Sequence, residues 1–270
     1  MVELFEKNIR TNDRQSSKGN QLKWQGDNGI WYKADYTGYE GLTEYIISEF
    51  LGNSTLAVDE FVFYKTEEIQ YKHQRYLGCA SKDFLPKGWK LITLERLFQN
   101  YYGKSLHQLI YSMQGVPERI QFVVEQTIRI TDLKEFGEYM SKLLTIDAIF
   151  LNEDRHTHNI AVRMDEKENF QYCPIFDNGA ALLSDTSQDY PLGIETRKLM
   201  SEVKPAIISS EFDEILDAVE QLYGSHINFK FSAEDIEKIL KKENYYSTEI
   251  KSRVYDILTK QIKKYSYLFM

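Results

Sequence analysis

One polar octapeptide carries much of the chemical information in this chain, Asn152-Glu-Asp-Arg-His-Thr-His-Asn159. It directly follows a long apolar helical pattern that ends with Ile149-Phe-Leu151. Eight polar residues after a buried helix are unusual for a purely structural loop, and loops held by a rigid scaffold commonly carry active groups. We therefore take this loop as the centre of a candidate active site and relate the rest of the chain to it.

A second polar cluster, Phe176-Asp-Asn-Gly179, lies beyond a predicted β-hairpin. Short apolar runs at 160–164 and 170–176 flank a polar turn, which is the pattern of two paired strands. A turn centred near residue 168 predicts that Asn159 lies roughly opposite Asp177. The hairpin would thus bring the two clusters together.

The residue types in these clusters suit phosphoryl transfer. Carboxylate and carboxamide oxygens are ligands that Mg²⁺ prefers and shares with substrate phosphates. We therefore expect Asn159 and Asp177 to bind Mg²⁺. Asp154 would lie within reach of a substrate hydroxyl, so Asp154, Asn159 and Asp177 form the predicted catalytic set.

Each of these residues also has a simpler interpretation when it is taken singly. Asp177 before a glycine is typical of a turn, and Asp154 beside Arg155 is typical of a surface ion pair. His156 and His158 suggest a zinc site, but the chain has five histidines and no third ligand at a suitable spacing. The spacing of the whole set favours the phosphoryl-transfer interpretation.

The chain divides by its hydrophobic patterns into two regions, which predicts a bilobal α+β fold; together with the phosphoryl-transfer set, this favours a fold of the protein-kinase type. Residues 1–85 are expected to form a small β-rich nucleotide-binding lobe, and residues 86–270 a larger helical catalytic lobe. The predicted strands of the first lobe are 20–24, 30–34, 57–64 and 75–81, with a helix at 39–51. The predicted helices of the second lobe are 91–101, 117–130, 132–151, 211–223, 233–241 and 249–265.

The β-rich lobe supplies candidates for binding the phosphates of ATP. Lys33 lies on a predicted strand, where a kinase places its phosphate-binding lysine. The following helix carries Glu44 and Glu49, and we favour Glu44 as the partner of Lys33 because it lies near the middle of the helix. A loop at 16–23 would cover the phosphates, although it lacks a full glycine-rich motif. For Lys33 alone, a solvated strand lysine is the simpler interpretation.

Composition limits the class of protein. The 270 residues include 33 Lys and Arg against 41 Asp and Glu, a formal charge of −8 that disfavours a general nucleic-acid or membrane-surface binder. No apolar run approaches the length of a membrane span, and the first residues are too charged for a signal peptide. The two cysteines, Cys79 and Cys173, are expected as reduced thiols, a single bond between them being the alternative. We expect a cytoplasmic protein.

Three motifs together resemble the HipA-like serine/threonine kinases, the kinase components of bacterial toxin–antitoxin modules. Asp154-Arg-His-Thr-His-Asn159 and Asp177-Asn-Gly179 resemble the catalytic and metal-binding motifs of that family. Ser16-x-x-Gly19-x-Gln21-x-Lys23 resembles its phosphate loop, S-x-x-G-x-Q-x-K. The three motifs span residues 16–179 in the family's order.

The resemblance implies roles for individual residues. Asp154 would act on the acceptor hydroxyl, Asn159 and Asp177 would bind Mg²⁺, and Arg155 and His156 would support the loop. ATP would contact the following residues: Ser16, Ser17, Gly19, Gln21, Lys23, Lys33, Glu44, Asp83 and Phe84. Asp83 and Phe84 belong to the expected hinge at 79–85. Ser16 would be the site of an inhibitory autophosphorylation.

The resemblance also implies a protein substrate with a serine or threonine acceptor. A helix-turn-helix antitoxin, or a separate protein equivalent to the N-terminal subdomain of HipA, is the expected partner. No direct nucleic-acid or membrane binding is expected. Family members include an effector kinase that enters host cells, so secretion stays open. The alternatives are a lipid or small-molecule kinase on the same fold and a catalytically silent binding module.

Overall fold

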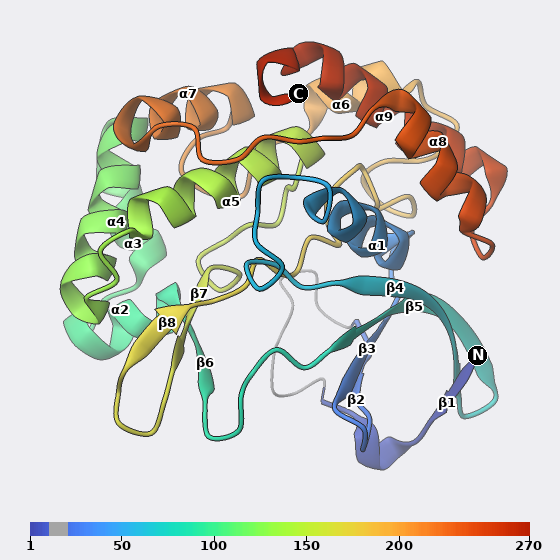
Figure 1. Ribbon diagram of the computed structural model, residues 1–270, viewed down its shortest axis with the longest axis horizontal. Helices are drawn as coiled ribbons and strands as arrows, with labels where there is room; N and C mark the ends of the chain where they lie inside the picture. Colours follow the sequence, from blue (N-terminus) through green and yellow to red (C-terminus); the bar gives the residue numbers. More distant parts are fainter. Residues whose placement is uncertain (11–20) are drawn as a thin grey trace. The chain divides into compact units, whose positions relative to one another are not determined.

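The computed structural model describes residues 1–10 and 21–270, and it has an α+β fold (Figure 1). The fold class expected from the sequence is therefore confirmed. Of the predicted site residues in the expected phosphate loop, Ser16, Ser17 and Gly19 lie outside the described residues. No helix in the described part of the chain is long and apolar enough to cross a membrane.

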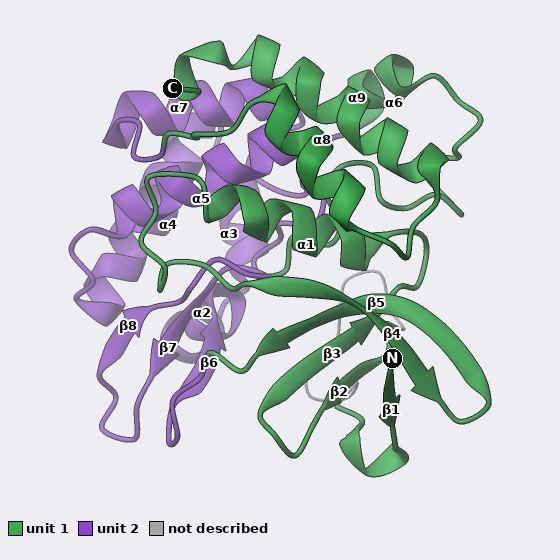
Figure 2. Cartoon of the chain, turned by 45° about the vertical axis from the view of Figure 1, so that its right-hand side comes forward, with its two compact units in different colours: residues 1–84, 177–203, 228–270 green, residues 85–176, 204–227 purple. Residues whose placement is uncertain are grey.

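The described chain forms two compact units that are not contiguous in sequence (Figure 2). Unit 1 comprises 1–84, 177–203 and 228–270, and unit 2 comprises 85–176 and 204–227. The first crossing between the units follows Phe84, one residue before the predicted division at 85/86. The later crossings follow Phe176, Val203 and Ile227 and have no counterpart in the predicted division.

Unit 1 contains a five-stranded sheet with the strand order β1-β4-β5-β3-β2. β1 runs parallel to β4, and the remaining neighbours are antiparallel. The strands are β1 (Val2–Leu4), β2 (Lys23–Gln25), β3 (Ile30–Ala34), β4 (Tyr64–Tyr71) and β5 (Gln74–Lys82), with a short 3₁₀ helix, η1 (Glu6–Asn8), after β1. Trp24 and Ile69, both fully buried, lie in the core cluster on one face. The β2–β3 hairpin turns at Gly29, whose φ of +72° suits a glycine.

The helix α1 (Glu40–Leu51) packs on β4 and β5 of this sheet. Its apolar residues, including Leu42, Ile46 and Phe50, are fully buried. Two glycines permit the close approach, since a Cβ added to Gly41 would lie 2.4 Å from the carbonyl carbon of Gly78. The first turn of α1 is therefore tightly fixed against β5.

The C-terminal part of unit 1 is helical. Its elements are α6 (Thr196–Glu202), α8 (Ala233–Lys242), α9 (Thr248–Lys264) and the 3₁₀ helix η2 (Ser266–Leu268). α9 packs on both α6 and α8. Arg253 of α9, almost fully buried, donates to the carbonyls of Tyr190 and Pro191, both at 2.6 Å. The segment that follows Asp177 is thereby tied to the C-terminal helices.

Unit 2 combines helices with a three-stranded antiparallel sheet of order β6-β7-β8. The strands are β6 (Lys90–Thr93), β7 (Ala161–Met164) and β8 (Phe170–Tyr172). The helices are α2 (Leu94–Tyr102), α3 (Leu106–Tyr111), α4 (Val116–Thr131), α5 (Phe136–Phe150) and α7 (Phe212–Tyr223). α5 is the central helix, and it packs on α4 and α7.

Among the predicted elements whose bounds differ from the structure, two show the reason most clearly. The apolar run 57–64 is mostly loop, because Phe61 and Val62 are buried as loop residues and β4 begins only at Tyr64. The predicted helix at 91–101 begins at Leu94, because residues 91–93 pair with β7. Short apolar runs do not distinguish strand, helix and buried loop, since all three bury side chains.

Candidate functional site

Lys33 lies at the centre of a buried charge cluster in unit 1. Its Nζ atom is 2.6 Å from Glu44 Oε1 on α1 and 2.6 Å from Asp177 Oδ1. The side chain of Lys33 is 14% exposed and that of Glu44 is 2% exposed. The structure thus pairs Lys33 with Glu44, the partner that the helix position favoured over Glu49.

The surroundings keep Lys33 charged. Burial by itself would lower the pKa of Lys33, but the carboxylates of Asp177 and Glu44 outweigh it and raise that pKa well above the ordinary value. The ammonium also lies 5.2 Å from the centre of the Tyr64 ring, which adds a cation–π contact. A strand lysine held this way is a fixed positive charge, in contrast to the solvated lysine of the simpler interpretation.

The backbone conformation at Asp177 is unusual. Its φ of +60° is left-handed, a region that aspartate tolerates better than most residues. The following residue, Asn178, donates its backbone N–H to Glu44 Oε2 at 2.9 Å. Glu44 therefore accepts from both Lys33 and Asn178, which links α1 to the segment that carries Asp177. An aspartate that only shaped a turn would need neither the ion pair with Lys33 nor this link to α1.

In unit 2, the polar loop is organised by Arg155. Its guanidinium forms two 3.0 Å hydrogen bonds with the carboxylate of Asp147, a residue of α5. Arg155 and Asp147 are each 3% exposed. Asn152 donates to the same carboxylate at 2.9 Å. The interpretation of Asp154 and Arg155 as a surface ion pair is wrong, because the partner of Arg155 is a buried acid on the preceding helix.

Arg155 also holds the two ends of the β7–β8 hairpin. Its Nη1 atom donates to the carbonyl of Asn159 at 3.2 Å and to that of Phe176 at 2.8 Å. Asp177 is the next residue after Phe176 in the chain. A single buried guanidinium therefore fixes the backbone at Asn159 and the backbone from which Asp177 continues.

The loop brings Asp154 and Asn159 together. Asn159 Nδ2 donates to the carbonyl of Asp154 at 2.9 Å and to its Oδ2 at 3.4 Å. Neither contact uses the acceptor atom Oδ1 of Asn159. The side chain of Asp154 is 19% exposed, and its Oδ1 atom lies 3.9 Å from His156 Nε2.

The predicted register of the hairpin is wrong by two residues. Val162 pairs with Tyr172 and Met164 with Phe170, so continuation of the ladder would place Asn159 opposite residue 175 and not opposite Asp177. The turn explains the difference, because the Asp165 carboxylate accepts the N–H groups of Lys167 and Asn169. These bonds centre the turn one residue earlier than the sequence suggested.

Backbone hydrogen bonds join the start of α2 to the polar loop. The N–H groups of Leu94 and Glu95 donate to the carbonyls of Ile160 and Thr157. Although partial burial raises the pKa of Glu95, hydrogen bonds from Ser105, Thr157 and the amide of His107 outweigh it and lower that pKa. His156 accepts the N–H of His158 through Nδ1, which uses a ring nitrogen within the loop. No cluster of three or more histidine, cysteine or acidic side chains in residues 1–10 and 21–270 could hold a metal ion.

The remaining predicted nucleotide contacts lie in unit 1. Lys23 on β2 pairs with Lys33 in the strand register and is 6% exposed, and Gln21 precedes β2 in partly buried surroundings. Asp83 follows β5 and is tied to the β2–β3 hairpin by a hydrogen bond from Gln25 at 3.0 Å. Phe84 is the last residue of the first segment of unit 1.

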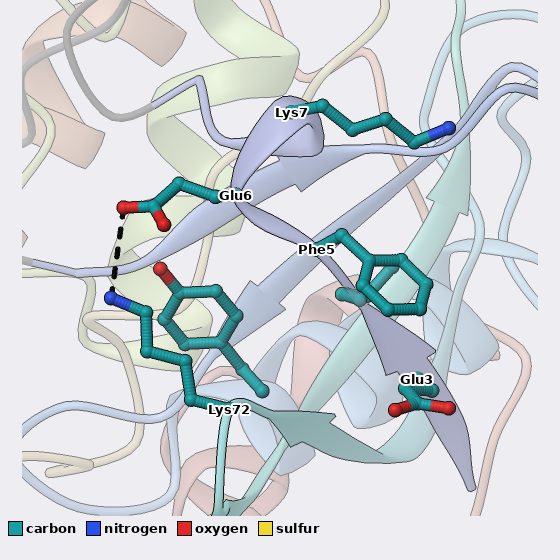
Figure 3. Close-up of a pocket in the computed structure, with 7 residues that line it drawn as sticks. Glu3, Phe5, Glu6, Lys7 and Lys72 are labelled. Atoms are coloured by element: carbon teal, nitrogen blue, oxygen red, sulfur yellow. Dashed lines mark ion pairs between the residues drawn. The ribbon is translucent and has the colours of Figure 1, made fainter.

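A separate surface pocket lies beside β1, with a volume of about 560 Å³ (Figure 3). It is lined by Glu3, Leu4, Phe5, Glu6, Lys7, Tyr71 and Lys72. In Figure 3 Glu6 points toward Lys72, and their ion pair measures 3.6 Å. None of the predicted site residues that the structure describes lines this pocket.

Three residues support the site without a role predicted from the sequence. Asp147 binds Arg155, Asn152 donates to Asp147, and the ring of Tyr64 faces the ammonium of Lys33. A sequence signal existed for Asp147, because it is an isolated acid in the apolar run Leu143-Leu-Thr-Ile-Asp-Ala-Ile-Phe150. A buried acid requires a partner, and the nearest arginine follows in the loop.

Comparison with solved structures identifies a similar fold. The chain matches the crystal structure of CtkA, a proinflammatory kinase from Helicobacter pylori, with a TM-score of 0.61 and 15% sequence identity. The match covers 97% of this chain and 95% of CtkA. No protein-family model matches the chain, and neither does any curated protein sequence. The similarity establishes a kinase-like fold over nearly the whole chain.

Proposed function

We propose that this protein is an ATP- and Mg²⁺-dependent serine/threonine protein kinase of the HipA-like type. The observation that carries the proposal is the placement of Lys33 between Glu44 and Asp177, at 2.6 Å from each carboxylate. A strand lysine held by a helix glutamate and paired with a metal-binding aspartate is the arrangement that protein kinases use for the phosphates of ATP. The fold similarity to CtkA supports the same conclusion.

The proposal gives each side chain a distinct role. Lys33 binds the phosphates of ATP, and Glu44 keeps the ammonium oriented. Asp154 accepts the proton of the substrate hydroxyl or orients that hydroxyl for attack on the γ-phosphorus. Phosphoryl transfer needs little covalent help, so the contribution of these residues is mainly positioning and charge stabilisation.

The chemistry of the donor atoms supports Mg²⁺ as the metal. Asn159 and Asp177 offer hard oxygen atoms, and the hydrogen bonds of the Asn159 amide described above use only its nitrogen. Bound Mg²⁺ would neutralise part of the phosphate charge and orient the γ-phosphoryl group. Because Asp177 pairs with Lys33, ATP binding would require this carboxylate to divide its contacts between the lysine and the metal.

Phosphate transfer from labelled ATP tests the proposal. Asp154→Asn and Asp177→Asn are expected to abolish transfer to protein, whereas Glu166→Gln, an exposed substitution on the β7–β8 turn, should leave it unchanged. Circular dichroism would verify that all three variants fold. Unchanged transfer in both active-site variants would refute the assignment.

A panel of acceptors distinguishes the classes of kinase. Purified protein with labelled ATP would be offered proteins, phosphoinositides and small hydroxylated metabolites. We expect labelled phosphoserine or phosphothreonine on protein, including the chain itself. Exclusive labelling of lipid or metabolite would show a different kinase on this fold, and ATP binding without turnover would show a silent binding module.

The resemblance to HipA-like kinases extends the proposal to a toxin–antitoxin module. Induced expression of the wild-type protein is expected to arrest bacterial growth, whereas Asp154→Asn should permit it. A small helix-turn-helix protein encoded beside this gene is expected to relieve the arrest. Equal growth of cells expressing the wild-type protein and Asp154→Asn would exclude a toxic activity.

A further inference from the structure

Two side chains far apart in sequence meet beside the candidate phosphate site. Tyr246, in the turn between α8 and α9, donates its hydroxyl to Asp35 Oδ2 at 2.7 Å, across 211 positions of the chain. The Tyr246 side chain is 6% exposed. Both residues belong to unit 1, and neither carries a role in the phosphoryl-transfer set.

The second oxygen of Asp35 binds the start of α1. Asp35 Oδ1 accepts the N–H of Gly41 at 2.6 Å, in the first helical turn. The first N–H groups of a helix have no partner within it, so a side-chain acceptor there fixes the helix end. Glu44 lies one turn further along α1, and Asp35 follows Lys33 by two residues. Asp35 therefore connects the strand of Lys33 to the helix of Glu44.

The turn that carries Tyr246 is itself well fixed. Glu243, which is 3% exposed, accepts the backbone N–H groups of Tyr245 and Tyr246 at 2.7 and 3.0 Å. Its carboxylate also lies 3.3 Å from Lys251 Nζ of α9. Because these bonds preorganise the turn, the Tyr246 hydroxyl is presented from a rigid support.

We propose that Tyr246 and Asp35 are positioning residues, which hold α1 where Glu44 reaches Lys33. The C-terminal helices α8 and α9 would thereby help to set the phosphate site. This inference rests on the proposed function, in which Lys33 binds ATP. The contacts with Gly78 and Asp35 fix the first turn of α1, so the helix has little freedom to shift. A shift of α1 would lengthen the 2.6 Å contact between Glu44 and Lys33.

Steady-state kinetics of Tyr246→Phe test the proposal. Loss of one hydrogen bond is expected to raise the KM for ATP about two- to tenfold, while kcat at saturating ATP changes little, because bound nucleotide itself holds Lys33. Tyr245→Phe is the matched control, since that neighbouring side chain is 42% exposed. Asp35→Asn should also raise KM. An unchanged KM in both Tyr246→Phe and Asp35→Asn would overturn the proposal.

Hydrogen exchange provides a test that does not depend on activity. In Tyr246→Phe, amides 41–44 of α1 are expected to exchange faster than in Tyr245→Phe, while amides of α5 stay unchanged. If the wild-type protein transfers no phosphate, the proposed function fails, and the exchange of α1 still decides the positioning role. Equal exchange in the two variants, or acceleration throughout the chain, would overturn it.

Discussion

Arg155 and Asp147 form a bidentate ion pair in the interior of unit 2, with two N–O distances of 3.0 Å. The pair connects the central helix α5 to the polar loop, and Arg155 also binds the carbonyls of Asn159 and Phe176. The loop conformation therefore depends on a contact between two buried charges. Removal of either partner would leave the other uncompensated.

Arg155→Met is expected to destabilise the protein by about 3–5 kcal/mol, because it leaves the Asp147 carboxylate buried without its cation. Urea denaturation would measure the change. Lys241→Met is the control, since its pair with Glu237 is exposed and solvent screening leaves it little effect on stability. A similar change for both variants would contradict the structural role of the buried pair.

Gly78→Ala is expected to destabilise unit 1 by at least about 1–3 kcal/mol, because the added methyl group would push the backbones of β3 and β5 apart. A Cβ at this position would lie 2.0 Å from the carbonyl oxygen of Lys33, which is backbone and has no flexible group that can yield. Gly193→Ala is the matched control, because nothing lies within 4 Å of a Cβ there. Thermal denaturation would compare the two variants, and equal melting temperatures would contradict the close approach of β3 and β5.

The titration of Asp35 is expected to make the free energy of unfolding depend on pH. Burial, and secondly the charge of Glu40, raise the pKa of Asp35 to about 7, although hydrogen bonds from Tyr246 and Gly41 oppose the shift. Cys79 on β5 is a further titratable neighbour. Between pH 4 and 7 the folded protein holds a proton that the unfolded chain has released, so stability falls as pH rises through this window.

The slope contributed by Asp35 is expected to reach about 1.4 kcal/mol per pH unit. Urea denaturation of the wild-type protein and of Asp35→Asn at several pH values between 5 and 8 would isolate it. The free energy of unfolding of the wild-type protein, relative to that of Asp35→Asn, should fall as the pH rises toward 7 and level off above it. Parallel curves for the two proteins would show that Asp35 has an ordinary pKa in the folded state.

Ser16 is the predicted site of self-inhibition. Phosphorylation there would add about −1.5 to −2 charges to the loop predicted to cover the ATP phosphates, and the repulsion would weaken ATP binding. Ser16→Asp is expected to bind a fluorescent ATP analogue more weakly than Ser16→Ala, as measured by titration. Mass spectrometry of wild-type protein incubated with ATP should find phosphate on Ser16. Full nucleotide affinity in Ser16→Asp would argue against the switch.

Local sequence patterns were sufficient for several features of this protein. The α+β class, the β7–β8 hairpin and the helix that carries Glu44 follow from periodicity and turn residues, which act over a few positions. The polar loop was recognisable because charged residues directly after a buried helix are rarely structural. The register of the β7–β8 hairpin could not be recognised, because the Asp165 side chain accepts hydrogen bonds within the turn and these bonds shift the strand pairing.

The contacts that assemble the candidate site were decided by the tertiary structure. Lys33 meets Asp177 across 144 positions, and Asp35 meets Tyr246 across 211. The chain has 41 acidic residues that could in principle pair with Lys33. Which of them does so depends on which helices and strands pack together. The amino-acid sequence by itself identified the polar groups and their local conformation. Tertiary packing selected their partners, because burial of a charge is tolerated only where the fold supplies the opposite charge.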